Sequence, residues 1–494
     1  MDSSQDLYAV LGVSPAASDQ EIQQAYRSVA RLFHPDVNGA SGAGALFKEI
    51  NAAYEVLSDR KRHTEYDTLR RDQDTNPRLE TYTYAWRQHI LPLDEPQMVH
   101  VLLTVKPTVM MSIGNQAPLN LCLVIDRSNS MSGERLGHVK GAAHHIIDNA
   151  NDEDVISVIA FSDKAEVIVP ATHPRDRRTM KATISTLRAS GATEIFAGLN
   201  LGVQQIMRHR APRYVNHIIL ITDGRTYGDE ENCLQLAEKV REDGIGISGM
   251  GIGEDWNDHF LDALTSRTGG SATYASSPST IRRFLEERVR TLVTAYAERA
   301  RLIAAPAPEV QLRSLYRLSP NPNELDAEAQ PIPIGTIDAT MPTSFLCEFH
   351  VTAGGREPGN LFVGRIDITG DILDERRSEK ILNDITVAVE PELVEEEPPP
   401  QLMDAISRVT LYRLQQRARD ALDQKDVAEA TRKLEYLATR LFEAGEEELG
   451  QAALVEARRV VQTSAFSEQG AKQLKYGTRA FLLPPGTMTI GEEA

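Results

Sequence analysis

The chain has 494 residues, of which 71 are acidic and 53 are basic, giving a formal net charge of −18. This length predicts about three domains, and the acidic balance excludes a general nucleic-acid or anionic-membrane surface, because phosphate binding draws on clustered Lys and Arg. Three widely separated cysteines imply no disulfide framework, as in a reducing compartment. No apolar run approaches the ~18 residues of a membrane helix, and the first residues are polar, so we expect a cytoplasmic protein.

The first seventy residues predict a hairpin of two helices. Ser18, followed three residues later by Glu21, is a helix N-terminal signal. Residues 22–33 place apolar side chains at helical spacing, and this helix ends before His34-Pro35-Asp36, because a residue before proline avoids the helical region. A second amphipathic helix is expected over about residues 45–58. The tripeptide then lies in the exposed turn between the two helices.

These segments resemble the J-domain of the DnaJ family, from Leu7 to Asp67. The resemblance rests on three phrases that match without a gap, namely Tyr8-Ala9-Val10-Leu11-Gly12-Val13, His34-Pro35-Asp36-Val37-Asn38 and the run from Lys48 to Asp59. It implies docking onto a DnaK-type chaperone and stimulation of that chaperone's ATP hydrolysis. The residues implied in chaperone binding are His34, Pro35, Asp36, Tyr26, Arg27 and Arg31.

One departure concerns the exposed face of the first hairpin helix, which family members usually line with lysines. Uncharged residues stand where cations are common, namely Gln23, Gln24, Ser28 and Leu32. Electrostatic steering raises association rates more than affinity, so we expect a slower or weaker encounter with the chaperone. The alternative is a hairpin that serves only as a packing module.

Strands are expected on both sides of a long central segment. After a polar linker over residues 71–79, alternating apolar and β-branched residues predict strands at Thr81–Trp86 and Met98–Val109. Later strands are expected at Val310–Leu318, Ser344–Val351, Asn360–Ile368 and Lys380–Val389. The simplest arrangement pairs both groups in one antiparallel β-sandwich, made of residues 80–115 and 301–392, with residues 116–300 inserted.

Oxygen-bearing side chains follow two predicted buried strands of the inserted segment, Leu119–Ile125 and Ile218–Thr222. A third group lies in the turn before a helix expected at Ile195–Met207. The loops at the carboxyl ends of parallel strands meet at a topological switch point. Carboxylates and hydroxyls are hard ligands that suit Mg²⁺ or Mn²⁺. The candidate ligands are Asp126, Ser128, Ser130, Thr193 and Asp223.

Three such loops in this order resemble the metal-ion-dependent adhesion site of von Willebrand factor type A (VWA) domains, over residues 116–300. Every ligand position of that motif is filled. The resemblance implies a Rossmann-like α/β fold and a cation held partly through hydroxyls and waters, with a sixth position open to an Asp or Glu of a partner protein. Glu194 could instead take that position itself, and an intact but idle site is the alternative. The expected sandwich arrangement also resembles that of several bacterial cytoplasmic proteins with VWA domains.

The C-terminal part begins with an acidic, proline-rich linker over residues 393–400. Helical spacing then predicts helices at Leu402–Leu422, Val427–Phe442 and Glu446–Val461. Their apolar stripes indicate buried packing rather than a partner-binding groove. Residues 401–494 are therefore expected to form a helical bundle with a loose tail after Leu483.

Signatures of catalysis are weak. Ser128 and Ser130 lack the Gly-x-Ser-x-Gly turn of a nucleophile. The glycines from Gly244 to Gly249 lie within a strand-like run, which does not suit a dinucleotide-binding loop. His144 and His145, adjacent on a helix, point about 100° apart, too far to share a transition metal. A metal-dependent hydrolase is the third-ranked hypothesis, because a bound cation can activate water.

The sequence thus predicts a multidomain protein that is not an enzyme. It combines an α-helical J-domain hairpin, a Rossmann-like VWA domain inserted in an antiparallel β-sandwich, and a C-terminal helical bundle. The leading hypothesis is a cytoplasmic co-chaperone adaptor with Mg²⁺ (or Mn²⁺) as cofactor. Its partners would be a DnaK-type chaperone and a protein that offers an Asp or Glu, with no nucleic acid and no membrane. A scaffold unrelated to chaperone cycling is the second hypothesis.

Overall fold

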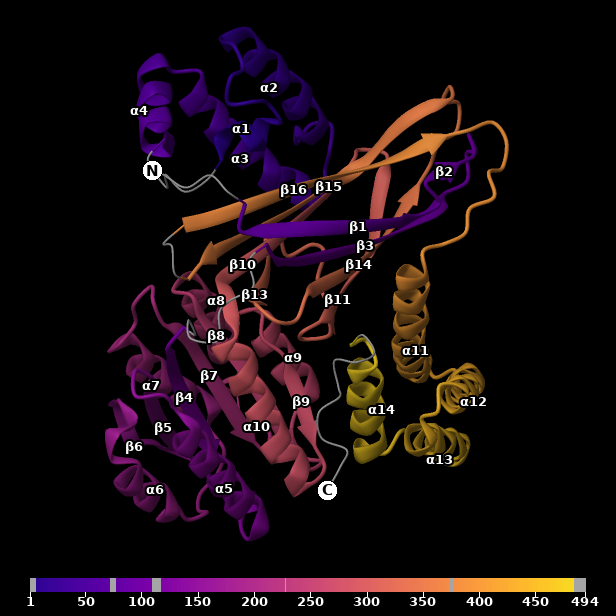
Figure 1. Ribbon diagram of the computed structural model, residues 1–494. Helices are drawn as coiled ribbons and strands as arrows, with labels where there is room; N and C mark the ends of the chain where they lie inside the picture. Colours follow the sequence, from indigo (N-terminus) through magenta and orange to yellow (C-terminus); the bar gives the residue numbers. More distant parts are fainter. Residues whose placement is uncertain (1–5, 72–76, 109–116, 227, 374–376, 484–494) are drawn as a thin grey trace. The chain divides into compact units, whose positions relative to one another are not determined.

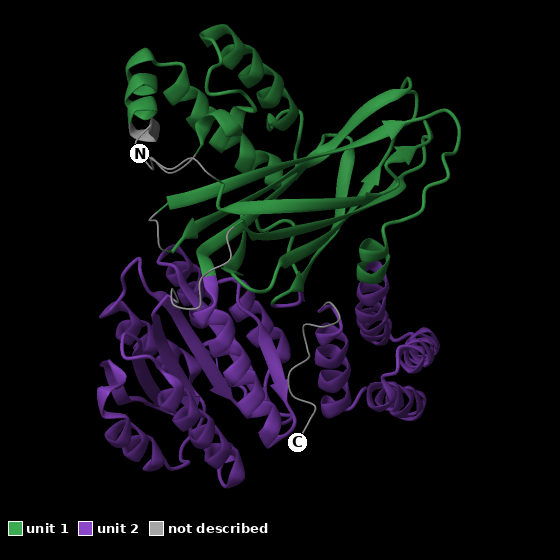
Figure 2. Cartoon of the chain, viewed as in Figure 1, with its two compact units in different colours: residues 1–112, 296–320, 324–405 green, residues 113–295, 321–323, 406–494 purple. Residues whose placement is uncertain are grey.

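The structure is a computed structural model that describes residues 6–71, 77–108, 117–226, 228–373 and 377–483. The chain divides into two compact units, coloured separately in Figure 2. Unit 1 contains residues 1–112, 296–320 and 324–405, and unit 2 contains residues 113–295, 321–323 and 406–494.

Unit 1 begins with four helices, α1 (Leu7–Leu11), α2 (Asp19–Phe33), α3 (Ser41–Leu57) and α4 (Arg60–Arg71). The Ser18 and Glu21 side chains form the reciprocal cap expected at the start of α2. Helix α3 starts four residues before the expected position, and α4 was not expected as a separate helix. The four helices share a core in which Tyr8, Phe33 and Ile50 are almost completely buried.

The strands of unit 1 form two five-stranded sheets, ordered β1-β3-β14-β11-β12 and β13-β10-β15-β16-β2. Their bounds are β1 (Leu79–Trp86), β2 (His89–Ile90), β3 (Gln97–Pro107), β10 (Ala295–Pro306), β11 (Val310–Ser319), β12 (Asn323–Glu324), β13 (Ile332–Asp338), β14 (Thr343–Val351), β15 (Gly359–Ile372) and β16 (Arg377–Val389). Strand β3 pairs antiparallel with β14, so strands from before and after the inserted segment lie in one sheet. All six predicted strands are present; Val109, the last residue of the second one, lies outside the described residues.

Strand β10 was missed in the sequence, because its charged residues interrupt the apolar pattern. A β-bulge lies between Glu298 and Arg301, and Arg299 has a φ of 49°. Such a bulge adds a residue and shifts the alternation of inward and outward side chains. The period-two signal that identified the other long strands is therefore broken in this one.

The N-terminal helices pack directly on the β10–β15–β16 face of the sandwich (Figure 1). Ile303 and Ala305 of β10 belong to the apolar core of the helices. The contact is close at Gly42 of α3, where a Cβ atom would lie 1.9 Å from the Ala304 carbonyl oxygen. Only glycine fits at that spacing, so the helices and the sandwich form one body.

Charged groups complete this contact. Lys380 of β16 is 2 % exposed and lies 2.9 Å from an Asp367 carboxylate oxygen, and it also pairs with Glu49 of α3. Burial raises the pKa of Asp367 to about 6, although the Lys380 ammonium opposes that shift. A buried ammonium group needs such partners, because an unpaired buried charge is costly. Glu49 therefore ties α3 to the sheet.

We expect Gly42→Ala to loosen the helices from the sandwich, because the new methyl group collides with backbone that cannot rotate away. Overpacking of this kind costs about 1–3 kcal/mol. Gly44→Ala in the same helix is the matched control, since nothing lies within 4 Å of its Cβ position. Hydrogen exchange should accelerate over α3 and β10 in Gly42→Ala alone. Equal exchange in the two variants would contradict the close contact.

Unit 2 is built around a six-stranded sheet, ordered β6-β5-β4-β7-β8-β9. Its strands are β4 (Leu119–Asp126), β5 (Val155–Phe161), β6 (Ala165–Thr172), β7 (Val215–Thr222), β8 (Ile245–Ile252) and β9 (Ala272–Ala275). All neighbouring pairs are parallel except β5 and β6. The helices are η1 (Asn129–Met131), α5 (Glu134–Asn149), η2 (Pro174–Asp176), α6 (Arg177–Ser185), α7 (Ile195–Met207), α8 (Glu230–Glu242), α9 (Asp258–Ser266) and α10 (Pro278–Val293).

The C-terminal helices are α11 (Pro400–Asp423), α12 (Val427–Glu443), α13 (Glu447–Thr463) and α14 (Glu468–Ala480). The first three match the expected helices to within two residues, whereas α14 had not been placed. Leucine and alanine side chains of all four helices share one buried core, as their apolar stripes predicted. The loose tail expected after Leu483 lies outside the described residues.

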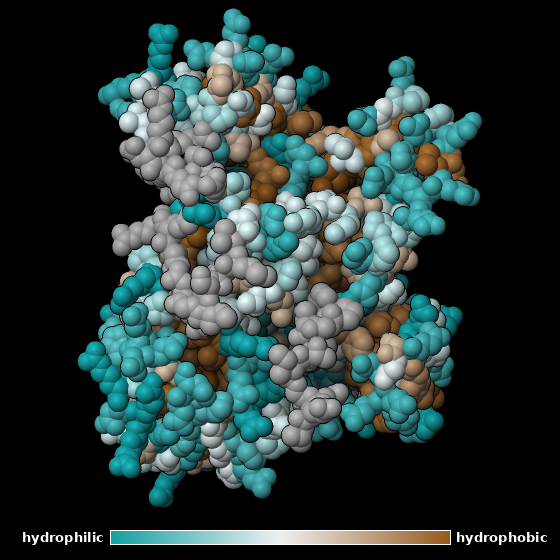
Figure 3. Space-filling model, in the orientation of Figure 1, coloured by the Kyte–Doolittle hydropathy of each residue, from teal (hydrophilic) through white to brown (hydrophobic). Residues whose placement is uncertain are grey.

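The surface shown in Figure 3 is largely hydrophilic. Among the exposed large apolar side chains, four lie on α12 and α13, namely Tyr436, Phe442, Val455 and Val461. Within the described part of the chain, no helix combines the length and the apolar character needed to cross a membrane.

Candidate functional site

Three loops of unit 2 meet at the carboxyl ends of β4 and β7. These two strands are neighbours at the middle of the sheet. The loop after β4 bonds to the turn before α7 through the Asn129 amide and Gly191 oxygen (3.1 Å) and the Ser190 amide and Arg127 oxygen (2.7 Å). Gly191 has a φ of 86°, and a Cβ there would lie 2.2 Å from Asp163. The polar loops therefore meet between β4 and β7, at the switch point that the sequence predicted.

Asp126, the last residue of β4, is fully buried and held at both oxygens. Its Oδ1 accepts from the Ser128 amide (2.8 Å) and its Oδ2 from the Thr222 hydroxyl (2.7 Å). Burial raises the pKa of Asp126, while these two hydrogen bonds oppose the shift. Thr222 was not among the predicted site residues, although its place at the end of β7, beside Asp223, could have indicated it.

Asp223 is also fully buried and joins the loop after β4. Its Oδ1 accepts from the Ser130 hydroxyl (2.7 Å), and the hydroxyl oxygens of Ser130 and Ser128 are 3.0 Å apart. Its Oδ2 accepts from the Arg135 guanidinium (2.8 Å) at the start of α5. Nothing in the sequence spacing signalled Arg135, because its contact depends on how α5 packs beside β7.

Thr193 brings the third loop to the same place. A Cβ at Gly224, the residue after Asp223, would lie 3.0 Å from the Thr193 hydroxyl oxygen. This hydroxyl makes no hydrogen bond with any described residue, which leaves both its lone pairs available. The neighbouring Glu194 is exposed, and no hydrogen bond or ion pair joins its carboxylate to the described part of the chain.

The five predicted ligand residues thus lie on three adjoining loops and offer two carboxylates and three hydroxyls. This donor set fits a hard divalent cation such as Mg²⁺, which takes oxygen ligands and retains some water. Transition-metal sites rich in His or Cys are not favoured here. Over the described residues, no group of three or more His, Cys, Asp or Glu side chains is gathered for a metal.

A second exposed site lies at the turn between α2 and α3. The Val37 and Asn38 amides donate to the His34 oxygen and close the turn (2.9 and 2.8 Å). The His34 Nδ1 accepts from the Asp36 amide (3.2 Å), and the His34 and Asp36 side chains are 44 % and 88 % exposed. The tip of the turn is therefore free to meet a partner.

Asn38 anchors the base of this turn. It is buried, and its amide group donates to the Leu32 oxygen (3.2 Å) and to the Pro306 oxygen of β10 (2.8 Å). Its Oδ1 accepts from the Ala40 amide (3.1 Å). The role of Asn38 is not visible in the sequence alone, because its second partner is 268 residues away.

The predicted chaperone-binding side chains of α2 do not all face solvent. Arg27 and Arg31 are exposed, as are the uncharged Gln23 and Gln24. Tyr26 instead stacks on Tyr54 of α3 at 3.9 Å, and its hydroxyl donates to Asn51 (2.9 Å). Tyr26 thus helps to pack α2 against α3, whereas the two arginines remain accessible to a partner.

The histidines of α5 and the cysteines do not form further sites among the described residues. His144 contacts the Lys181 oxygen, and His145 contacts Glu286. Cys122 of β4 is completely buried, and burial raises the pKa of its thiol to about 12. A thiol in that state is not a nucleophile near neutral pH.

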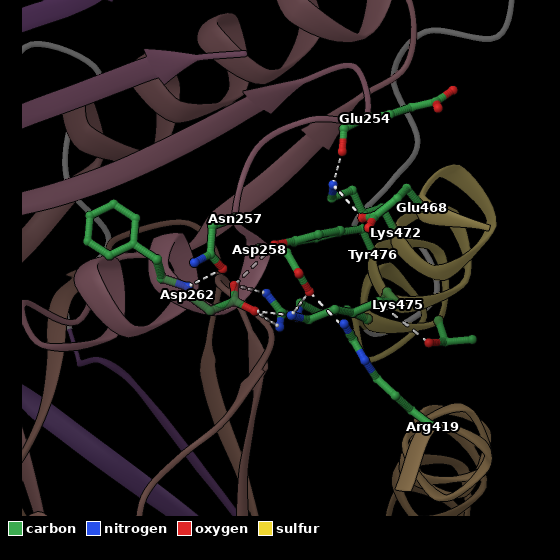
Figure 4. Close-up of polar contacts among 12 residues, drawn as sticks. Glu254, Asn257, Asp258, Asp262, Arg419, Glu468, Lys472, Lys475 and Tyr476 are labelled. Atoms are coloured by element: carbon green, nitrogen blue, oxygen red, sulfur yellow. Dashed lines mark hydrogen bonds and ion pairs between the residues drawn. The ribbon is translucent and has the colours of Figure 1, made fainter. Parts of the chain in front are cut away.

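Helix α14 packs against the α/β domain through a charged cluster next to the loop that follows β8 (Figure 4). Asp262 of α9 accepts two hydrogen bonds from Arg479 (2.7 and 2.8 Å) and lies 2.7 Å from Lys475. Lys475 also bonds to Asp258 (2.6 Å). Burial opposes ionisation of Asp262, but the Arg479 and Lys475 charges outweigh it and hold its pKa below the usual range.

Loss of this cluster should release α14. In Asp262→Asn the buried Arg479 loses its counter-charge, which typically costs about 3 kcal/mol or more. Because the folded-state pKa of Asp262 is lowered, its stabilisation is present above the unfolded-state pKa near 4 and is lost as the pH falls below it. The protection factors of the α14 amides, which correct for the pH dependence of intrinsic exchange, should therefore fall in acid in the natural protein. In Asp262→Asn they should already be low at pH 7, and unchanged protection factors there would contradict this role.

Three family models match separate segments of the chain. The "DnaJ domain" model matches residues 6–67, the "von Willebrand factor type A domain" model matches residues 120–287, and the "Sll0103-like, C-terminal alpha-helical domain" model matches residues 400–484. The chain therefore carries an N-terminal J-domain and a central VWA domain, as the sequence motifs predicted.

Two curated relatives match different parts. "Uncharacterized protein sll0103" of Synechocystis sp. is 33 % identical over 217 residues, which are 43 % of this chain and 51 % of that protein. "Chaperone protein DnaJ" of Erysipelothrix rhusiopathiae is 51 % identical over 67 residues, which are 14 % of this chain and 18 % of that protein. The chain thus spans about half of the first relative and under a fifth of the second.

Solved structures share the fold over most of the chain. "von Willebrand factor type A from Catenulispora acidiphila" has a TM-score of 0.65 at 18 % identity, covering 82 % of this chain and 98 % of that one. The "ArnB paralog VWA2 from Sulfolobus acidocaldarius" has a TM-score of 0.51 at 15 % identity, covering 82 % of this chain and 100 % of that one. At these identities the likeness concerns the fold alone.

Proposed function

We propose that this protein is a co-chaperone adaptor of the cytoplasm. Its VWA domain would bind a partner protein through a divalent cation, and its J-domain would recruit a DnaK-type chaperone and stimulate that chaperone's ATP hydrolysis. The observation that carries the proposal is the presence of two separate polar sites on one chain, each fixed by buried hydrogen bonds and each with an exposed polar side chain, Ser130 in one and Asp36 in the other. Linking two binding sites raises the effective concentration of one bound partner near the other.

Support for the J-domain half comes from the turn at His34-Pro35-Asp36. Its tip is exposed, while Asn38 fixes its base. This segment also lies within residues 6–67, which the DnaJ domain model matches. Because α2 presents Arg27 and Arg31 but not the usual lysines, the encounter with an acidic chaperone surface would be steered less strongly.

Support for the cation half comes from the donor set. Asp126, Asp223 and the hydroxyls of Ser128, Ser130 and Thr193 would hold Mg²⁺ or Mn²⁺. The cation, when bound, would supply an open coordination position that attracts a carboxylate oxygen of a partner. The chain's own residues keep both buried carboxylates oriented through Thr222, Ser128 and Ser130, which limits the reorganisation needed on binding.

A scaffold role is the second candidate, and two observations favour it. The exposed face of α2 lacks cations at Gln23, Gln24 and Ser28, which weakens the case for chaperone recruitment. Four large apolar side chains are exposed on α12 and α13, where further proteins could bind. In this role the J-domain would serve only as a contact surface.

Single-turnover ATP hydrolysis by a DnaK-type chaperone tests the J-domain half. We expect the full-length protein to stimulate hydrolysis and His34→Gln to abolish the stimulation, because the exposed imidazole contributes to the turn but not to the core. The double variant Gln23→Lys, Gln24→Lys should stimulate more strongly at low salt than at high salt. If neither the natural protein nor the lysine variant stimulates hydrolysis, the scaffold role is favoured.

Binding of Mn²⁺ to the full-length protein, measured by titration calorimetry, tests the cation half. We expect Asp126→Ala to lose binding, and a chelator to reverse binding in the natural protein. Glu153→Gln is the control, an exposed carboxylate before the amino end of β5 that should leave cation affinity within about twofold, since the three loops lie at the carboxyl ends of the strands. Equal affinity in Asp126→Ala and the natural protein would rule out this cation site.

A further inference from the structure

Arg135 forms an ion pair with one of the proposed cation ligands. Its Nη1 lies 2.8 Å from the Asp223 Oδ2, the carboxylate oxygen that Ser130 does not use. The Asp223 side chain is completely buried, whereas the Arg135 side chain is 41 % exposed. The guanidinium is therefore both attached to the donor set and reachable from solvent.

The structure holds this guanidinium in place from a second side. Gly253, in the loop after β8, has a φ of 70°, and a Cβ there would lie 2.9 Å from the Arg135 Nη2. The next residue, Glu254, is bound through its backbone oxygen by Lys472 of α14 (Figure 4). Arg225 donates to the Asp255 oxygen (3.0 Å). The loop is thus fixed, and Arg135 lies between it and Asp223.

Two other arginines near the site behave differently. Arg127 donates to the Ser190 hydroxyl (3.0 Å) and pairs with Glu166 (3.4 Å). Arg225 pairs with Glu468 at 3.5 Å. Neither is bonded to a ligand carboxylate within the described residues. Arg135 is therefore the arginine whose charge acts most directly on the donor set.

A positive charge in this position has two consequences for ligands. It offsets one of the two carboxylate charges, so it repels a divalent cation and lowers the affinity for the cation alone. A guanidinium also carries five N–H donors. The Arg135 Nη1 donates to Asp223 (2.8 Å) and to the Ser130 backbone oxygen (3.5 Å). The Nε and Nη2 donors make no hydrogen bond with the described residues and can receive a carboxylate, for which the planar guanidinium fork is well suited.

We infer that Arg135 determines the ligand class of the site. One oxygen of a partner carboxylate would bind the cation, and the other would bind the Arg135 guanidinium. The incoming negative charge compensates the arginine, so cation and carboxylate strengthen each other's binding by the same factor. The ligand class is an Asp or Glu side chain of an acidic protein segment. This inference rests on the proposed cation site and adds the residue that makes cation binding depend on the partner.

The first measurement is Mn²⁺ affinity of the full-length protein, read from the electron paramagnetic resonance signal of free Mn²⁺. Arg135→Gln should bind Mn²⁺ about tenfold more tightly than the natural protein, because a like charge is removed close to the cation. Arg135→Lys, which keeps the charge, should stay close to the natural affinity. Arg127→Gln is the matched control and should also change little, since its charge is paired with Glu166.

The second measurement uses acetate as the carboxylate probe, with water-proton relaxation reporting the waters on bound Mn²⁺. Acetate should displace water and tighten Mn²⁺ binding in the natural protein and in Arg127→Gln. In Arg135→Gln the acetate effect should weaken, because only the cation still binds the carboxylate, and Arg135→Lys should retain more of it. The opposite changes in cation and acetate affinity cannot arise from a misfolded site, which would lose both.

The outcomes separate the two proposals. If the natural protein binds no Mn²⁺, or if Asp126→Ala binds it equally, the proposed cation site is wrong and this inference falls with it. Another outcome is that Mn²⁺ binds through Asp126 while Arg135→Gln changes neither the Mn²⁺ affinity nor the effect of acetate. In that case the cation site stands and the role of Arg135 is overturned. An acetate effect of equal size in both proteins overturns it as well.

Discussion

The burial of two carboxylates beside each other is the constraint on which the central site depends. Asp126 and Asp223 have no exposed surface, so each needs partners that replace water. Thr222, Ser128, Ser130 and Arg135 supply these partners from three different elements. The loops after β4 and β7 are thereby joined before any ligand arrives, and a cation would meet oxygens that are already oriented.

The same principle shapes the turn between α2 and α3, although there the chain secures a loop rather than a charge. Both the nitrogen and the oxygen of the Asn38 side-chain amide form hydrogen bonds with backbone atoms, one of them in β10. Gly42 and Glu49 extend this attachment along α3. The J-domain is thus fixed to the sandwich on one face, while His34 and Asp36 remain accessible on another. Both sites are therefore held in place by buried hydrogen bonds.

Much of this architecture could be predicted from the sequence. Strong periodicity located α2, α7, the buried strands β4 and β7, and the long sandwich strands, while local motifs indicated the five oxygen donors. Features that depend on distant packing were missed. The bulge in β10 breaks the alternating pattern that would have identified this strand. Helix α14 can be buried only because α9 supplies counter-charges for it. Asn38 and Arg135 acquire their roles from partners far along the chain. Periodicity reports which face of an element is apolar, and it does not report which element will cover that face.

The pairing of β3 with β14 also sets an order of events during synthesis. The whole VWA domain separates these two strands in the sequence. Strand β3 therefore cannot pair with β14 until residues beyond 340 have been synthesised. The VWA sheet has its strands within one continuous segment and can form earlier, as domains do when they emerge from the ribosome. The J-domain is made before both groups of sandwich strands, yet the surface that receives it includes Lys380 of β16. A nascent chain therefore displays an undocked J-domain until β16 has been made, at the stage when unfinished strands are most exposed to aggregation.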